Sequence, residues 1–184
     1  MISRAVVVGD ELMSRCYPAV QLVMPVSVAG ATLSGMAEDQ TVLWAVTVDC
    51  ADPGLLAAFW ETALGYRPAD PPTGFDSWEQ WFEKCEVPEE ERNDGATIQD
   101  PTGRSPQIGF LKVPEGKTVK NRWHLDLKVS GGRAQPPELR TERIEAKVAA
   151  LLAAGASELL RGPDEGPLDH VTMADPEGNE FCVV

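Results

Sequence analysis

The chain has 184 residues, of which 43% are hydrophobic, and its formal net charge is −13 at pH 7. This length and apolar content suit one globular domain, or two small ones that share a core. The acidic balance argues against a nucleic-acid-binding protein, which needs clustered Lys and Arg, and is typical of a solvated surface. The four cysteines are Cys16, Cys50, Cys85 and Cys182, and no Cys-x-x-Cys pair occurs among them. This spacing favours reduced thiols in the cytoplasm over a disulfide framework.

Residues 1–40 differ in character from the rest of the chain. Charged side chains such as Asp10, Glu11 and Arg15 interrupt their apolar residues, and no run reaches the roughly 18 residues that a membrane helix requires. The same interruptions argue against a secretory signal peptide. We therefore expect a poorly ordered extension, or a start codon assigned too early, ahead of a compact domain that begins near residue 41.

The domain opens with a strand and a helix. Apolar and other side chains alternate over residues 41–50 and put Thr47 and Asp49 on one face, which predicts a half-buried strand. Asp52-Pro53 is typical of a helix start, because Asp caps the first turn and Pro needs no N–H partner there. Apolar residues at helical spacing then continue to Gly65, which suits the left-handed end of a helix.

A helical insertion is expected near residues 76–85. Trp78, Trp81 and Phe82 lie on one side of this short segment. Such an aromatic helix could form a lid over a pocket, or cover a sheet edge or a dimer interface. Further strands are expected around residues 96–98 and 108–113, on either side of the turn sequence Asp100-Pro-Thr-Gly.

The second half of the chain repeats the first. Residues 123–129 alternate strictly, with His124, Asp126 and Lys128 between apolar neighbours, which predicts another half-buried strand. A helix is expected at 143–154, and Asp175-Pro-Glu-Gly repeats the earlier turn sequence. The sequence thus predicts two modules, residues 41–113 and 114–184, that pair across a shared core.

This tandem of strand–helix–strand–strand–strand modules resembles the vicinal oxygen chelate superfamily. The resemblance covers residues 41–184 and is strongest with bacterial glyoxalase-like domain proteins, through His124 in the first strand of module two and the ending Asp175-Pro-Glu-Gly-Asn-Glu-Phe-Cys-Val. It implies an α+β fold in which two paired βαβββ modules form a curved, cup-shaped mixed sheet with helices on the outside. It also implies a small-molecule ligand in the cup, and a homodimer.

The resemblance also bears on metal binding. Metal-dependent members of the superfamily hold a divalent ion through the first and last strands of the modules, and His124 matches one such position. Ala45 at the same place in module one cannot ligate, and Cys182 stands where those relatives carry Glu. Glyoxalase activity is therefore disfavoured, and we prefer no metal. If Fe, Mn, Ni or Zn binds, the expected ligands are two histidines and one carboxylate, His124, Glu180 and His170.

Several functions fit the polar strand face. We favour a metal-independent lyase or isomerase that transfers a proton with His124, Glu180 and Asp126. Ligand contacts are expected from Thr47, Asp49, Trp78, Trp81, Lys128 and Cys182, and we expect the Cys182 thiol to be inert. The alternatives are a metal-dependent lyase or dioxygenase, a non-catalytic protein that binds a drug or antibiotic, and a satisfied polar network without a ligand. Three cations of the linker could attract an anionic ligand, although such a loop is more often solvated or paired with the protein's own carboxylates: Lys117, Lys120 and Arg122.

Overall fold

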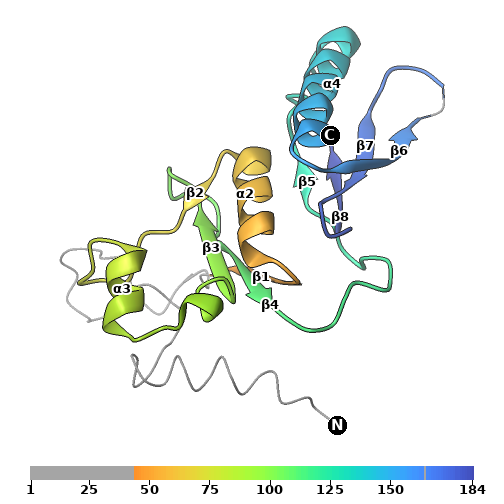
Figure 1. Cartoon of the computed structure of the whole chain (residues 1–184). Coiled ribbons are helices and arrows are strands. Elements are labelled where there is room, and N and C mark those ends of the chain that lie inside the picture. The colour runs from red at the N-terminus through yellow and green to blue at the C-terminus, as the bar shows by residue number, and fades with distance from the viewer. Residues whose placement is uncertain (1–43, 164) are drawn as a thin grey trace, which may run out of the picture. The chain divides into compact units, whose positions relative to one another are not determined.

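The computed structural model describes residues 44–163 and 165–184 (Figure 1). The predicted N-terminal extension lies outside these residues. The described residues fall into two compact units, one made of Trp44 with Asp70–Arg92 and the other of Ala45–Ala69 with Asn93–Val184. Among their helices, none combines the length and the apolar character needed to cross a membrane.

The smaller unit contains helix α3 (Trp78–Lys84) and the 3-10 turn η1 (Glu89–Glu91). Ser77 begins α3, because its hydroxyl accepts a hydrogen bond of 3.1 Å from the backbone N–H of Gln80. The rings of Trp78, Trp81 and Phe82 contact one another with centroid distances of 5.7, 6.1 and 5.4 Å. A helix with this aromatic cluster therefore occupies the segment where the insertion was expected.

The first module lies in the larger unit and builds a four-stranded sheet beside one helix. Its elements are β1 (Val46–Cys50), α2 (Pro53–Leu64), β2 (Arg67–Pro68), β3 (Gly95–Gln99) and β4 (Ile108–Lys112). The strand order is β1-β4-β3-β2, with β1 parallel to β4 and the other pairs antiparallel. Asp52 caps α2 by accepting from the N–H of Leu55, and Gly65 ends it at φ 70°, as predicted.

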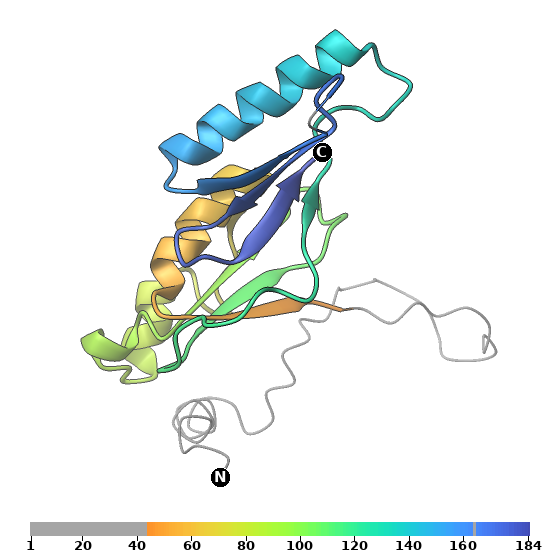
Figure 2. The same cartoon turned by 90° about the vertical axis from the view of Figure 1, so that its right-hand side faces the viewer.

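The second module has the same plan. It consists of β5 (Asp126–Leu127), α4 (Pro137–Ala153), β6 (Ser157–Gly162), β7 (His170–Ala174) and β8 (Glu180–Val183). The strand order β5-β8-β7-β6 repeats that of module one, and α4 runs along this sheet (Figure 2). The predicted α+β fold of two βαβββ modules is confirmed, with the strands hydrogen-bonded as two mixed sheets.

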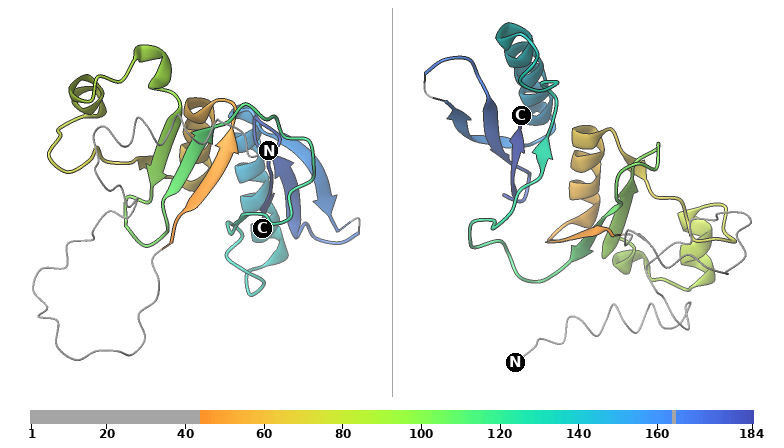
Figure 3. Two further views of the ribbon diagram at one scale, coloured as in Figure 1. Left: turned by 90° about the horizontal axis from the view of Figure 1, so that it is seen from below. Right: turned by 180° about the vertical axis from the view of Figure 1, so that it is seen from behind.

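Two predicted elements have different limits. The strand expected over 123–129 is reduced to Asp126–Leu127, and Trp123, expected on the buried face, is 64% exposed. A long irregular connection leads from β4 to β5 (Figure 3), and β5 is an edge strand that pairs with β8. Helix α4 begins at Pro137 and not at residue 143. The prediction missed the first turns because they lie outside the apolar stripe on which it was based, whereas Pro suits the first turn of a helix.

One core joins the two modules. Phe59 and Trp60 of α2 contact Phe181 of β8, with ring centroids 5.9 and 5.2 Å apart. Buried side chains of α4 complete the cluster, among them Ile144 and Val148. Each module thus covers apolar surface of the other, as the repeat predicted.

The cysteines of the described residues are of two kinds. Cys50 and Cys182 are free. Cys85 is disulfide-bonded, so the prediction of reduced thiols is wrong at this position. The error has a simple origin: a disulfide needs sulfurs that are close in space, which spacing along the chain does not reveal.

Candidate functional site

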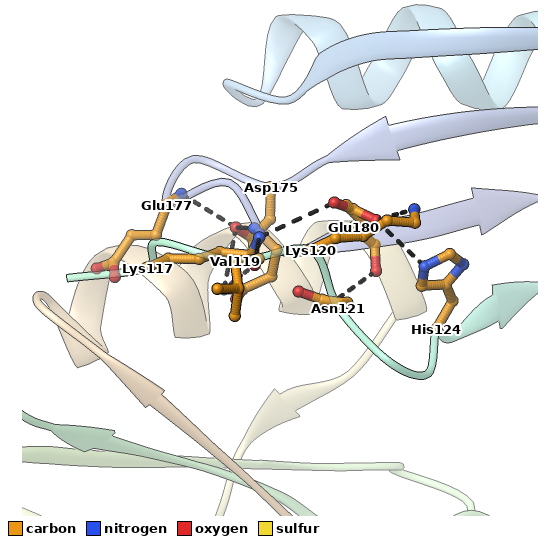
Figure 4. Close-up of polar contacts among 9 residues, drawn as sticks. Lys117, Val119, Lys120, Asn121, His124, Asp175, Glu177 and Glu180 are labelled. Carbon is orange, nitrogen blue, oxygen red and sulfur yellow. Dashed lines mark hydrogen bonds and ion pairs between the residues drawn. The ribbon is translucent and has the colours of Figure 1, made fainter. Parts of the chain in front are cut away.

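His124 and Glu180 lie side by side on one face of the second module's sheet (Figure 4). His124 Nε2 is 3.3 Å from Glu180 Oε2, and the two side chains are 27% and 13% exposed. We call this side of the sheet the open face, because the opposite side is filled by buried core residues. The open face carries His124, Asp126, Thr172, Glu180 and Cys182, whereas the core side carries Leu127, Val171, Phe181 and Val183.

The strand register explains why these side chains meet. Asp126 pairs with Cys182 in the parallel ladder of β5 and β8, and the N–H of Cys182 donates to the carbonyl of Leu125 at 2.9 Å. Side chains of a strand alternate between its faces, so His124 and Glu180, each two residues earlier, face the same side. The alternation read from the sequence therefore puts this pair together correctly.

Two lysines of the linker surround Glu180. Lys120 Nζ donates to Glu180 Oε2 at 2.6 Å, and Lys117 Nζ is 4.0 Å from Oε1. The hydrogen bond from Lys120, more than any other contact, holds the pKa of Glu180 below its usual range. Asn121 adds a 3.4 Å hydrogen bond from its side chain to the Glu180 carbonyl. Glu180 is therefore a carboxylate at neutral pH and can accept a hydrogen bond from His124.

Cys182 lies on the other side of the imidazole. Its sulfur is 3.9 Å from His124 Nδ1 and 3.6 Å from Thr172 Oγ1. The open face thus carries a thiol, an imidazole and a carboxylate in a row; the sequence pattern put Cys182 beside Glu180 but did not predict the order of the three groups.

Other predicted site residues are not joined to this row. Asp126 and Lys128 are exposed on or next to β5, and Thr47 and Asp49 are exposed on β1. Within the described part of the chain, no hydrogen bond or ion pair links any of these four to His124 or Glu180. Their roles stay predictions, as does the lid formed by two side chains of the smaller unit, Trp78 and Trp81.

The third conditional metal ligand, His170, is not brought to His124 and Glu180. His170 pairs with Gly162 and is four residues along β7 from Ala174, which pairs with Glu180. At about 3.3 Å per residue this separates His170 from the pair by roughly 13 Å. Among the residues described, no three His, Cys, Asp or Glu side chains are grouped to hold a metal ion. Lys120 would also repel a dication at Glu180, so the donor set does not fit.

The register also reveals the counterpart of this pair in module one. Thr47 pairs with Gly109 as Asp126 pairs with Cys182, so Gln107 corresponds to Glu180. Gln107 Nε2 donates to Gln99 Oε1 at 3.1 Å, and Ala45 takes the place of His124. Sequence analysis missed Gln107, because the turn after Asp100 is two residues longer than the turn after Asp175 and shifts the alignment.

A recess lies beside the site in the linker. Its volume is about 360 Å³, and it is lined by four consecutive residues, Val119, Lys120, Asn121 and Arg122. Lys120 therefore borders the recess and bonds Glu180 at the same time.

Comparisons with known proteins give one family and several structures. The family model described as glyoxalase-like domain matches residues 45–184. No curated protein sequence matches the chain. A glyoxalase/bleomycin resistance protein/dioxygenase family enzyme from Burkholderia phytofirmans PsJN is 18% identical, with 75% of this chain and 93% of that chain covered and a TM-score of 0.46.

Two further structures are similar at lower identity. The hypothetical protein SA1046 from S. aureus is 14% identical, with 81% of this chain and 94% of that chain covered and a TM-score of 0.48. The fosfomycin resistance protein FosX from Listeria monocytogenes, complexed with Mn(II) and sulfate ion, is 11% identical, with 79% and 90% covered and a TM-score of 0.48.

Proposed function

Because the chain belongs to the glyoxalase-like domain family, we propose that it binds a small organic molecule over the open face of module two and catalyses a proton transfer in it. The observation that carries this proposal is the 3.3 Å contact between His124 Nε2 and the Glu180 carboxylate. A carboxylate beside an imidazole orients the ring and raises its basicity, which is what a general base requires. The reaction class is that of a lyase or isomerase.

His124, Glu180 and the two linker lysines have separate roles in this proposal. Glu180 accepts the Nε2–H of His124, so Nδ1 is the ring nitrogen that takes a proton from a carbon of the ligand. The imidazolium then returns this proton to a neighbouring carbon, in an isomerase, or to a leaving group, in a lyase. Lys117 and Lys120 supply positive charge for an anionic group of the ligand.

The test combines binding with proton exchange. A panel of organic acids and carbonyl compounds is screened by thermal shift, and each binder is followed by NMR in D₂O for loss of a C–H signal. We expect His124→Gln to keep most of the thermal shift and to slow exchange by about 100-fold, the usual share of general acid–base catalysis. Gln107→Ala, the matched change in module one, should leave both unchanged. Exchange that His124→Gln does not slow would refute the proposal.

A second candidate is a non-catalytic binding protein. It is favoured by the neutralisation of Glu180, which already bonds Lys120 and His124 before any ligand arrives. Tight binding without exchange, weakened by Lys120→Met, would support it. Metal content of protein purified without chelator tests the metal-dependent alternative, which requires about one ion per chain that is lost in both His124→Ala and Glu180→Ala.

A further inference from the structure

The row of Cys182, His124 and Glu180 has the connectivity of an activated thiol. Cys182 Sγ faces Nδ1 of the imidazole at 3.9 Å, and Nε2 of the same ring faces the carboxylate at 3.3 Å. A nucleophile, a base and a group that orients the base are the parts that nucleophilic catalysis requires, and such contacts are often long before a substrate is bound.

The tautomer of His124 follows from its two partners. Glu180 is ionised and can only accept, so the imidazole donates Nε2–H to it. Nδ1 is then an acceptor, and the group it faces is the S–H of Cys182. Thr172 Oγ1, at 3.6 Å from the sulfur, can donate to the thiolate once the proton has moved. The transferred proton therefore has an acceptor in His124 Nδ1, and the thiolate has a hydrogen-bond donor in Thr172 Oγ1.

We propose that Cys182 adds covalently to small α,β-unsaturated carbonyl compounds, with His124 as its base. This inference rests on the ligand site of the proposed function and names a ligand class for it. His124 Nδ1 takes the thiol proton, and the sulfur forms a bond to the β-carbon. The electron pair of the C=C bond moves to the α-carbon and carbonyl oxygen, and the imidazolium returns the proton to the α-carbon. The step is an addition, so atoms balance and no oxidant or reductant is needed.

The other free cysteine of the described residues provides an internal reference. Cys50 is 2% exposed, and its thiol donates to the carbonyl of Leu111 at 3.5 Å. Burial, assisted by the nearby carboxylate of Glu177, raises the pKa of Cys50 to about 12. Cys50 should therefore be inert to electrophiles at neutral pH, in contrast to Cys182.

The experiment uses the full chain and N-ethylmaleimide, which belongs to the proposed ligand class. The second-order rate of modification at Cys182 is measured at pH 7 by peptide mass spectrometry, with N-acetylcysteine as the free-thiol reference. We expect Cys182 to react faster than N-acetylcysteine although it is half-buried, and Cys50 to stay unmodified. His124→Gln should slow Cys182 by about tenfold or more, and Gln107→Ala should not.

A rate at Cys182 no higher than that of N-acetylcysteine would overturn the inference. So would a rate that folded His124→Gln leaves unchanged. If His124→Gln does not fold, the wild-type comparison with N-acetylcysteine decides alone. Two separate readouts distinguish the inference from the proposed function, because mass spectrometry reports the reaction of the thiol and NMR reports proton exchange in the ligand. Exchange that His124→Gln slows, together with an unreactive Cys182 in the wild type, would refute only the thiol chemistry.

Discussion

The two Asp-Pro-x-Gly turns have the same sequence pattern and different partners. In module one, the Asp100 carboxylate accepts from the backbone N–H groups of Thr102, Arg104 and Ser105, all within its own turn. In module two, Asp175 is 3% exposed and accepts from the indole Nε1 of Trp60 at 3.2 Å, as well as from Asn179 of its own turn. One turn closes on itself, and the other joins the modules.

The third residue of each turn follows the same division. Thr102 donates its hydroxyl back to Asp100 at 2.8 Å. Glu177 instead accepts from the backbone N–H groups of Ala51 and Asp52 at 2.7 to 3.0 Å, just before α2 begins. Asp175 and Glu177 are drawn together in Figure 4, where the N–H of Glu177 donates to Asp175. A repeated motif thus fixes a backbone turn, while its variable position decides what the turn binds.

The largest expected effect is that of removing the buried turn carboxylate. Asp175→Ala leaves the indole of Trp60 and the N–H groups of Glu177 and Asn179 without their acceptor. Removing a buried carboxylate that accepts several hydrogen bonds lowers the free energy of unfolding by about 3 kcal/mol. Urea denaturation measures it, with Asp100→Ala as the matched surface control. Equal losses in the two variants would show that the turn of module two does not join the modules.

A smaller loss is expected at the start of α2. Glu177→Ala removes the acceptor of two backbone N–H groups and a negative charge at the positive end of the helix. Together these contribute about 1–2 kcal/mol. The same urea titration measures this, and Glu177→Gln, which keeps one acceptor oxygen, should lose less. A Thr102→Ala variant as unstable as Glu177→Ala would contradict the division between the turns.

The repeat could be read from the sequence because it depends on local patterns. The alternation around His124, the cap at Asp52 and the glycine at Gly65 each determine local geometry, and all are seen in the structure. The partners of Asp175 and Glu177 could not be read, because Trp60 and Ala51 are more than a hundred residues away and nothing local encodes their approach.

The site was predicted in part for the same reason. Strand alternation placed Glu180 on the face of His124, but it cannot say that Lys120 of an irregular linker would bond that carboxylate. His170 shares the polar character of the site and yet lies four residues along β7 from the row of Glu180, since register depends on strand pairing. Contacts along one strand pair were therefore predictable, and contacts across the sheet or from the linker were not.

The self-contained turn of module one should open in acid. Hydrogen bonds from the backbone and side chain of Thr102 lower the pKa of Asp100 from 3.8 to about 2. A depressed pKa means that the stabilising contribution is present above pH 3.8 and is lost as the pH falls through about 2. The amide shifts of Thr102, Arg104 and Ser105, followed by NMR, should move together with that midpoint. Thr102→Val removes the hydroxyl and should raise the midpoint. An unchanged midpoint would show that the hydrogen bond from the Thr102 hydroxyl does not lower the pKa of Asp100.

The smallest expected effect concerns the charge on the open face. Lys120 bonds Glu180 at 2.6 Å, whereas Lys117 is 4.0 Å from the same carboxylate, so the two lysines form a matched pair of probes. Lys120→Met should raise the pKa of Glu180 toward its ordinary value, and Lys117→Met should raise it less, because Lys120 is the principal cause of the depression. A ¹³C NMR titration of Glu180 measures both. Equal shifts would mean that long-range charge, and not the Lys120 hydrogen bond, keeps Glu180 ionised. Lys120 could then bind an anionic group of the ligand without raising the pKa of Glu180.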